Sequence, residues 1–254
     1  MKIDVRDIKT IYINMNSEPK KKEATEKILK RLKFKDWDRF PGVVDKRFQR
    51  AIKSHYKLLS DPNLKAPFTV LEDDIIYKES DKMIYNVPDN ADALYLGTTT
   101  LGYILDYTGR FVVYKPVPKN KDIVRVYNML IAHAIIYLSD DYKNMVKRCC
   151  EYHLEENPNK AFDLSVAEIM KYYKVYALDK PMFSQVGQNR GITNVILTQT
   201  GITGRKANEV YGRLQKCRIS ANENNLSARF PRFAPFRYNG MKIIDGNHAQ
   251  TKNT

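Results

Sequence analysis

Residues 68–74 read Phe-Thr-Val-Leu-Glu-Asp-Asp, an apolar run that ends abruptly in three carboxylates. A run of aromatic and β-branched residues bounded by Pro67 predicts a buried central strand. Acids at the C-terminal tip of such a strand lie where open α/β sheets hold their ligands. Adjacent like charges raise one another's pKa unless a cation or a hydrogen-bond donor offsets the repulsion. The stretch therefore predicts either a Mg²⁺ or Mn²⁺ site that also holds substrate phosphates, or a solvated acidic turn.

Charge is distributed unevenly along the chain, whose formal net charge is +14. Residues 1–60 contain 17 lysines and arginines against 8 acids, residues 61–185 contain 15 against 18, and residues 186–254 contain 11 against 3. An acidic middle between two basic ends indicates a site with a basic rim facing a polyanion, such as nucleic acid, an acidic glycan or an anionic membrane. A generic basic protein is the alternative.

The length of 254 residues suits one large α/β domain, or a smaller one with an appendage. The composition changes near residue 190, where we expect the boundary between residues 1–190 and a basic, aromatic extension over 191–254. No apolar stretch approaches the roughly 18–20 residues of a membrane span. Because Cys149, Cys150 and Cys217 have neither metal-ligand spacing nor a disulfide framework, we expect a cytoplasmic protein.

Strand and helix patterns alternate over residues 8–178, which predicts an α/β fold. The expected strands are 8–15, 68–71, 91–97, 132–138 and 175–178, with a hairpin over 103–113 that turns at Thr108 and Gly109. The expected helices are 20–32 with Ser17 as N-cap, 46–59, one that begins at 139–141 and ends near Tyr152, and one that begins at Asp163 or Ser165. A turn is expected at 39–43 and a loop at 115–121.

The segment after residue 190 combines cations with aromatic residues. Residues 205–217 are a candidate basic helix, and residues 229–238 interleave arginines with phenylalanines around two prolines. Such a segment can offer stacking faces and phosphate contacts to a nucleic-acid strand. The candidate nucleic-acid-binding residues are Arg205, Lys206, Arg213, Arg229, Arg232 and Arg237. A structural arm that buries its phenylalanines against the domain is the equal alternative.

A series of short motifs runs in a characteristic order along residues 8–190. They are Ile11-Tyr12-Ile13-Asn14 followed by Ser17-Glu18-Pro19-Lys20, then Arg39-Phe40-Pro41-Gly42-Val43, Ser54-His55, Leu71-Glu72-Asp73-Asp74, 92–97, Ala132-His133-Ala134, Phe162-Asp163, and Pro181-Met182-Phe183 with Gln185. In order and spacing this series resembles glycosyltransferase family 25, the family of lipooligosaccharide and collagen galactosyltransferases.

The resemblance implies an A-type glycosyltransferase fold, which is a Rossmann-like mixed sheet flanked by helices. It also implies a nucleotide-diphosphate sugar donor such as a UDP-sugar, a divalent metal (Mn²⁺ or Mg²⁺) and inversion at the anomeric carbon. By position, Asp74 and Asp73 correspond to the metal ligands. The residues that would face the nucleotide sugar are Asn14, Asn16, Lys20, Glu72 and Asp73.

The same resemblance implies three catalytic candidates. Asp163 corresponds to an aspartate near the acceptor and is the candidate general base, while His55 and His133 match histidine motifs of the family. From the residues alone, a histidine beside an apolar helix face is more often packed than catalytic.

The acceptor follows from the charge rather than from the resemblance. Neutralising phosphates with lysine and arginine releases counterions, so strongly basic flanks favour DNA as a partner. We therefore expect an enzyme that glycosylates a hydroxymethylated base in viral DNA, in the host cytoplasm. A lipopolysaccharide or capsule glycan transferase with peripheral membrane contact is one alternative. A non-catalytic polyanion-binding module with a transferase fold is the other.

Overall fold

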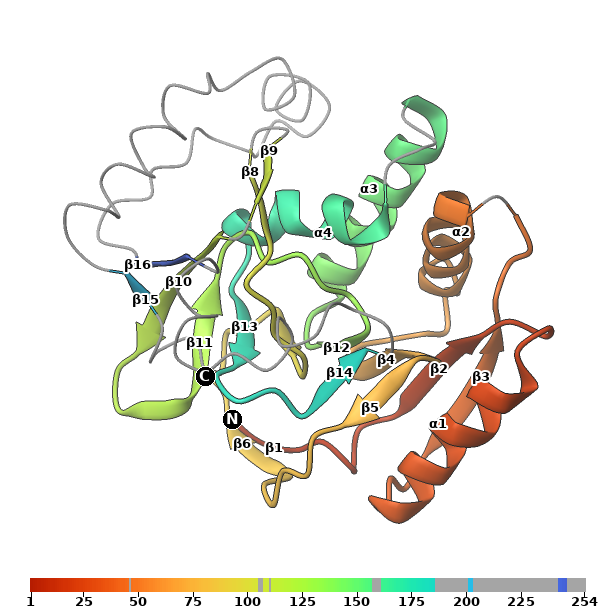
Figure 1. The fold of residues 1–254 in the computed structure, drawn as a ribbon, viewed down its shortest axis with the longest axis horizontal. Coiled ribbons are helices and arrows are strands. Elements are labelled where there is room, and N and C mark those ends of the chain that lie inside the picture. The colour runs from red at the N-terminus through yellow and green to blue at the C-terminus, as the bar shows by residue number, and fades with distance from the viewer. Residues whose placement is uncertain are drawn as a thin grey trace, which may run out of the picture.

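The computed structural model describes residues 1–45, 47–104, 107–109, 111–156, 161–185, 201–202 and 242–245. Its centre is a mixed sheet of ten strands in the order β15-β16-β10-β11-β13-β7-β12-β4-β2-β3 (Figure 1). These strands are β2 (Thr10–Asn14), β3 (Trp37–Pro41), β4 (Phe68–Glu72), β7 (Ala93–Tyr95), β10 (Phe111–Val117), β11 (Asn120–Val126), β12 (Ala134–Tyr137), β13 (Val175–Leu178), β15 (Gly201–Ile202) and β16 (Lys242–Asp245). The protein is therefore a mixed α/β fold, as the alternating sequence pattern predicts.

The sheet combines parallel and antiparallel pairings. Strand β2 runs parallel to both β3 and β4, and β13 runs parallel to β7. Strand β12 lies antiparallel between β4 and β7, and β11 and β10 extend the sheet by antiparallel pairing beyond β13. The C-terminal ends of β2, β4, β7 and β13 consequently meet at one edge of the sheet, where the N-terminal end of β12 joins them.

Helices cover both faces of the sheet (Figure 1). The helices are α1 (Pro19–Arg31), α2 (Arg47–Leu59), α3 (Asp140–Glu156) and α4 (Phe162–Ile169), followed by the 3₁₀ turn η1 (Met170–Tyr172). One apolar cluster joins α2, α3 and α4 to one face of the sheet, and a second cluster joins α1 to the opposite face. Alternation along β4 explains this arrangement, because Phe68 and Val70 belong to the first cluster and Leu71 to the second.

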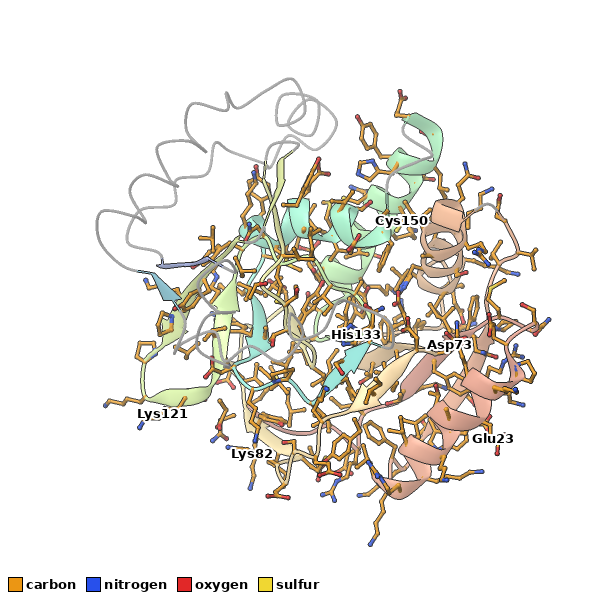
Figure 2. All side chains as sticks on the ribbon, viewed as in Figure 1. Glu23, Asp73, Lys82, Lys121, His133 and Cys150 are labelled. Carbon is orange, nitrogen blue, oxygen red and sulfur yellow. The ribbon has the colours of Figure 1, made fainter. Side chains whose placement is uncertain are left out.

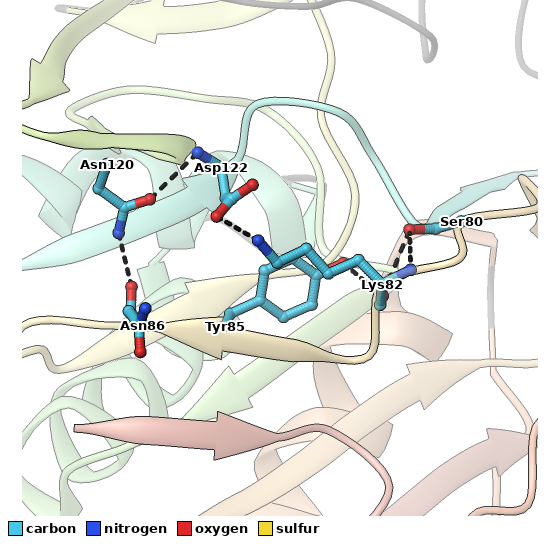
Figure 3. Close-up of polar contacts among 6 residues, drawn as sticks. All are labelled: Ser80, Lys82, Tyr85, Asn86, Asn120 and Asp122. Carbon is cyan, nitrogen blue, oxygen red and sulfur yellow. Dashed lines mark hydrogen bonds and ion pairs between the residues drawn. The ribbon is translucent and has the colours of Figure 1, made fainter.

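Three two-stranded ribbons complete the described fold. They pair β1 (Lys2–Asp4) with β6 (Ile84–Asn86), β5 (Ile75–Tyr77) with β14 (Phe183–Gln185), and β8 (Gly102–Ile104) with β9 (Tyr107–Gly109). The β1–β6 ribbon is fastened to the β10–β11 hairpin by polar contacts (Figure 3). Lys82 forms an ion pair with Asp122 at 2.5 Å, and the Asn120 amide donates a hydrogen bond of 2.7 Å to the Asn86 carbonyl.

The strands and helices with the strongest apolar patterns were predicted correctly. The strands expected at 8–15, 68–71, 91–97, 132–138 and 175–178 are confirmed as β2, β4, β7, β12 and β13, and the four expected helices are confirmed as α1 to α4. Strand β4 is buried and central as expected, because Phe68, Thr69, Val70 and Leu71 are all 0% exposed. Long runs of buried residues on both faces identify an inner strand without tertiary information.

Four local predictions were wrong. The expected turn at 39–43 overlaps the edge strand β3, whose half-exposed residues give no apolar run. The expected loop at 115–121 is a hairpin of β10 and β11, in which Pro116 is accommodated where the ladder register shifts. Thr108 and Gly109 lie within β9 rather than at a turn, and α1 begins after Glu18 with no side-chain cap from Ser17.

None of the helices in the described part of the chain is long and apolar enough to cross a membrane.

Candidate functional site

Two parallel strands bring their C-terminal ends together at the candidate site. Ile13 of β2 pairs with Glu72 of β4, so Asn14 and the acidic turn after β4 are neighbours. The Glu72 amide donates a hydrogen bond of 2.8 Å to the carbonyl of His133, which precedes β12. Figure 2 accordingly shows Asp73 and His133 close together at this edge of the sheet. The acidic turn thus occupies the position that the sequence pattern predicts, beyond the strand ends.

Asn14 is the hub of a polar network on the β2 side. Its amide donates to Asp73 Oδ2 at 2.6 Å and to the Glu18 carbonyl at 3.1 Å. Arg39 of β3 donates from Nε to Asn14 Oδ1 at 2.9 Å and from Nη2 to the Asn14 carbonyl at 3.0 Å. From α1, the Thr25 hydroxyl donates to the Asp73 carbonyl at 3.2 Å. Asn14 of β2 and Thr25 of α1 therefore fix the side chain and backbone of Asp73, and Arg39 of β3 holds Asn14 in place.

Glu72 and Asp74 converge on one side-chain amide. Gln185 Nε2 donates to Glu72 Oε2 at 2.7 Å and to Asp74 Oδ1 at 3.3 Å. Burial raises the pKa of Glu72 to about 7, and the charge of Asp73 adds to the rise. Burial also raises the pKa of Asp74 to about 7, with the charge of Glu72 as the next cause. Both carboxyls therefore bind a proton more tightly than exposed acids do, because few neighbouring groups stabilise their charged forms.

The donor chemistry of this turn fits a hard divalent cation. Within the described ranges, no three histidine, cysteine or carboxylate side chains are gathered closely enough to hold a metal ion by themselves. Mg²⁺ and Mn²⁺ sites at phosphate substrates commonly use only one or two carboxylates, with phosphate oxygens and water as the other ligands. Glu72 and Asp74, which already share one hydrogen-bond donor, supply that pair of carboxylates.

His55 closes the site from the α2 side. Its ring stacks on Phe162 at a centroid distance of 3.6 Å, and its Nε2 lies 3.6 Å from Glu72 Oε1. The side chain is 1% exposed, and neither ring nitrogen has a hydrogen-bond partner. Burial lowers the pKa of His55 to about 3, so the ring is neutral beside Glu72. The adjacent Ser54 hydroxyl accepts a hydrogen bond of 2.8 Å from the Val43 amide, which ties the loop after β3 to α2.

Asp163 lies in the first turn of α4, directly after the Phe162 ring that packs on His55. Its Oδ1 accepts a hydrogen bond of 2.9 Å from the Leu164 amide. Burial raises the pKa of Asp163 to about 6, and the charge of Glu72 contributes to the rise. A carboxylate with a pKa just below neutrality is suited to accept a proton from a substrate.

His133 has a packing contact at the same edge. Its Nε2 lies 3.2 Å from the Phe183 carbonyl, so this nitrogen carries the proton and donates. Burial lowers the pKa of His133 to about 4. A Cβ added at Gly97 would lie 2.4 Å from His133 Nε2, so glycine two residues after β7 makes room for the ring. The ring is thereby held between β7 and β14.

The structure therefore brings most of the predicted residues together and leaves others at the rim or outside. Those gathered around the acidic turn are Asn14, His55, Glu72, Asp73, Asp74, His133 and Asp163. Asn16, in the loop between β2 and α1, and Lys20, in the first turn of α1, are both exposed, and the Asn16 side chain accepts a hydrogen bond from Arg39. The predicted nucleic-acid contacts at Arg205, Lys206, Arg213, Arg229, Arg232 and Arg237 lie outside the described residues.

Three contributors were not assigned to the site from the sequence. Arg39 could have been found from the parallel register, which places Tyr12 beside it and Asn14 beside Pro41 at the end of the same edge strand. Thr25 carries no local signal, because a threonine within a helix is usually read as a surface or packing residue. Gln185 is 113 positions from Glu72, and only the β5–β14 pairing brings it to the acidic turn.

The buried carboxyls make a testable contribution to stability. Because the pKa of Glu72 is raised to about 7, the folded state binds more protons than the unfolded state between the ordinary pKa and that value. The free energy of unfolding of the metal-free protein therefore loses this contribution as pH rises through that interval. We expect Glu72→Gln to raise the melting temperature in EDTA more at about pH 8 than at about pH 5.

The melting temperature of the variant has to be compared with that of wild type at each pH, because the lowered pKa of His55 changes the stability with pH in the opposite direction. Its lowered pKa makes the folded state lose stability as pH falls, so an absolute profile mixes the two effects. Glu23→Gln, an exposed change on the outer face of α1, is the matched control (Figure 2). An equal stabilisation by Glu72→Gln at both pH values would contradict the assignment.

No protein-family model matches the chain, and no curated protein matches it either.

Proposed function

We propose that this chain is an inverting, metal-dependent glycosyltransferase of the A-type fold, related to glycosyltransferase family 25. It moves a sugar from a nucleotide-diphosphate sugar, such as a UDP-sugar, to a hydroxyl acceptor. The observation that carries the proposal is the convergence of Glu72 and Asp74 on one polar donor at the C-terminal end of β4. A sheet edge with paired carboxylates and a neighbouring polar loop is where α/β enzymes bind nucleotides and phosphates.

The chemistry assigns a separate task to each side of the site. On the α4 side, Asp163 accepts the proton of the acceptor hydroxyl while the hydroxyl oxygen forms a bond to the anomeric carbon. The bond from that carbon to the donor phosphate breaks, and the nucleoside diphosphate leaves with the electron pair. On the β4 side, Glu72 and Asp74 would hold the cation, which would supply positive charge to offset that of the departing diphosphate. Asn14, held by two hydrogen bonds from Arg39, would face the nucleotide.

We further propose that the acceptor is a hydroxymethylated base in DNA. Support comes from α1, which begins at the site loop and carries six exposed cations: Lys20, Lys21, Lys22, Lys27, Lys30 and Arg31. Its first turn contains no acid, although basic residues there oppose the helix dipole. The charge of Lys21 reaches Asp74 and partly offsets its raised pKa, which places this end of α1 beside the acidic turn. A DNA backbone lying along α1 would bring a base to the site.

A transfer assay tests the proposal directly. The protein is incubated with Mn²⁺, a panel of nucleotide sugars and DNA that contains hydroxymethylated pyrimidines, beside unmodified DNA and a glycan acceptor, and the digested products are weighed. We expect a hexose or pentose mass increment on the hydroxymethylated base alone. An increment on the glycan alone would keep the transferase and overturn the DNA acceptor. No increment on any acceptor, with no metal-dependent binding of a nucleotide sugar, would overturn the enzyme and leave a polyanion-binding module.

Removing single positive charges from α1 tests whether this helix binds the backbone of a DNA acceptor. Lys27 and Lys30 are exposed cations of α1. If α1 tracks a phosphate backbone, Lys27→Gln and Lys30→Gln should each raise the KM for DNA and lower the salt slope of binding by about one. Transfer to a free hydroxymethylated nucleoside should be unchanged, because that acceptor has no phosphate backbone. Equal effects on both acceptors would contradict a role of α1 in DNA binding.

A further inference from the structure

Gln185 occupies the position between the two carboxylates at the end of β4. It is the last residue of β14 and pairs with Ile75, which directly follows Asp74. The ladder therefore fixes the distance of Gln185 from the acidic turn. Its Nε2 lies 2.7 Å from Glu72 Oε2 and 3.3 Å from Asp74 Oδ1. One neutral amide thus satisfies two carboxylates that repel each other.

Few other groups near these carboxylates could do the same. His55 Nε2 lies 3.6 Å from Glu72 Oε1 without forming a hydrogen bond, and in the described part of the chain no lysine or arginine forms an ion pair with Glu72 or Asp74. His55 is 1% exposed, and both of its ring nitrogens lack hydrogen-bond partners. A buried histidine with unpaired nitrogens beside the carboxylate of Glu72 is an incomplete polar site. The amide bridge and the buried, unpaired ring both point to a cationic ligand at this turn.

A glutamine side chain can serve such a site in two states. Its terminal carbon carries a nitrogen that donates and an oxygen that accepts, and rotation about χ3 exchanges them with little displacement of the chain. Carbonyl oxygens of glutamine are ordinary ligands of hard divalent cations. The same residue can therefore hold two carboxylates together when no ion is present and face an ion with its oxygen when one binds.

We propose that Gln185 is a cation-site residue that bridges Glu72 and Asp74 through Nε2 without an ion and turns Oε1 toward a bound divalent cation. This inference rests on the proposed function, which places the cation at this turn. It also gives the β5–β14 ribbon a function, because β14 carries the side chain that would bind either the two carboxylates or the ion. Gln185 is thus a positioning residue for the carboxylates and a ligand for the ion.

Binding of Mn²⁺ alone to the full chain tests the assignment, by electron paramagnetic resonance titration and by melting temperature in EDTA. Gln185→Met keeps the length of the side chain and removes both its donor and its acceptor. We expect this variant to bind Mn²⁺ roughly 10- to 100-fold more weakly and to melt at a lower temperature without metal. Gln185→Glu should bind Mn²⁺ more tightly than wild type and be the least stable without metal, because it adds a third carboxylate.

Ser184→Ala, on the same strand, is the control for disturbance of β14 and should leave Mn²⁺ affinity unchanged. Wild-type affinity in both Gln185 variants, with only the melting temperature lowered, would overturn the inference and leave Gln185 a structural bridge. If wild type binds no Mn²⁺ even with a nucleoside diphosphate present, both this inference and the metal of the proposed function fail. If Mn²⁺ binding follows the expected order but no sugar is transferred, only the proposed function fails.

Discussion

Replacing Asp74 with asparagine is expected to lower the rate of sugar transfer by about 10³-fold or more and to remove its dependence on Mn²⁺. The reason is that one of two carboxylates facing the cation position loses its charge. Asparagine retains an oxygen that can accept the hydrogen bond from Gln185, so the turn should keep its shape. The measurement is the initial rate at saturating donor over a Mn²⁺ titration, beside the thermal shift that Mn²⁺ induces.

Asp73→Asn is the informative comparison, because the two adjacent acids have different partners. Asp73 Oδ2 accepts a hydrogen bond from Asn14, whereas Asp74 faces Gln185. We therefore expect Asp73→Asn to weaken binding of the nucleotide sugar through the β2 loop, with a smaller loss of Mn²⁺ dependence. Full activity of Asp74→Asn at ordinary Mn²⁺ concentrations would remove Asp74 from the metal site.

The inner strands of the sheet could be predicted from the sequence, because burial on both faces requires a continuous run of apolar residues. Strand β4 is enclosed on both faces, so every residue from Phe68 to Leu71 is apolar or a buried threonine. The acids that follow mark the point where the strand leaves the core. The position of the acidic turn at a sheet edge could thus be predicted without any knowledge of tertiary contacts.

Edges and long-range partners could not be predicted in the same way. Strand β3 pairs on one side only, and its alternation of exposed and half-buried residues resembles a turn ending in Pro41 and Gly42. The partners of the acidic turn come from distant segments, since His55 precedes it and Gln185 follows it by more than 100 residues. Such contacts depend on the register of β5 with β14 and on the packing of α2, which local composition does not encode.

Replacing Asp163 with asparagine is expected to lower the transfer rate by about 10²- to 10⁴-fold, the usual contribution of a positioned general base. Asparagine can still accept the hydrogen bond from the Leu164 amide, so the start of α4 should be preserved. Because the pKa of Asp163 is raised to about 6, the wild-type rate should rise as pH increases through that value, where the carboxyl loses its proton. The measurement is kcat/KM against pH at saturating Mn²⁺.

Two features separate this role from a structural one. The Asp163→Asn variant should lose the rise in rate near its carboxyl pKa but keep wild-type affinity for the nucleotide sugar. It should melt no lower than wild type, because the change removes a carboxyl whose pKa is raised by burial. Asp163→Ala should lose the backbone hydrogen bond as well, and should therefore be both inactive and less stable.

The neighbouring charge of Glu72 adds a further check, because Glu72→Gln removes one cause of the raised pKa of Asp163. That variant should shift the remaining pH profile of Asp163 toward lower pH, whereas an unchanged profile would show that the proton is accepted elsewhere.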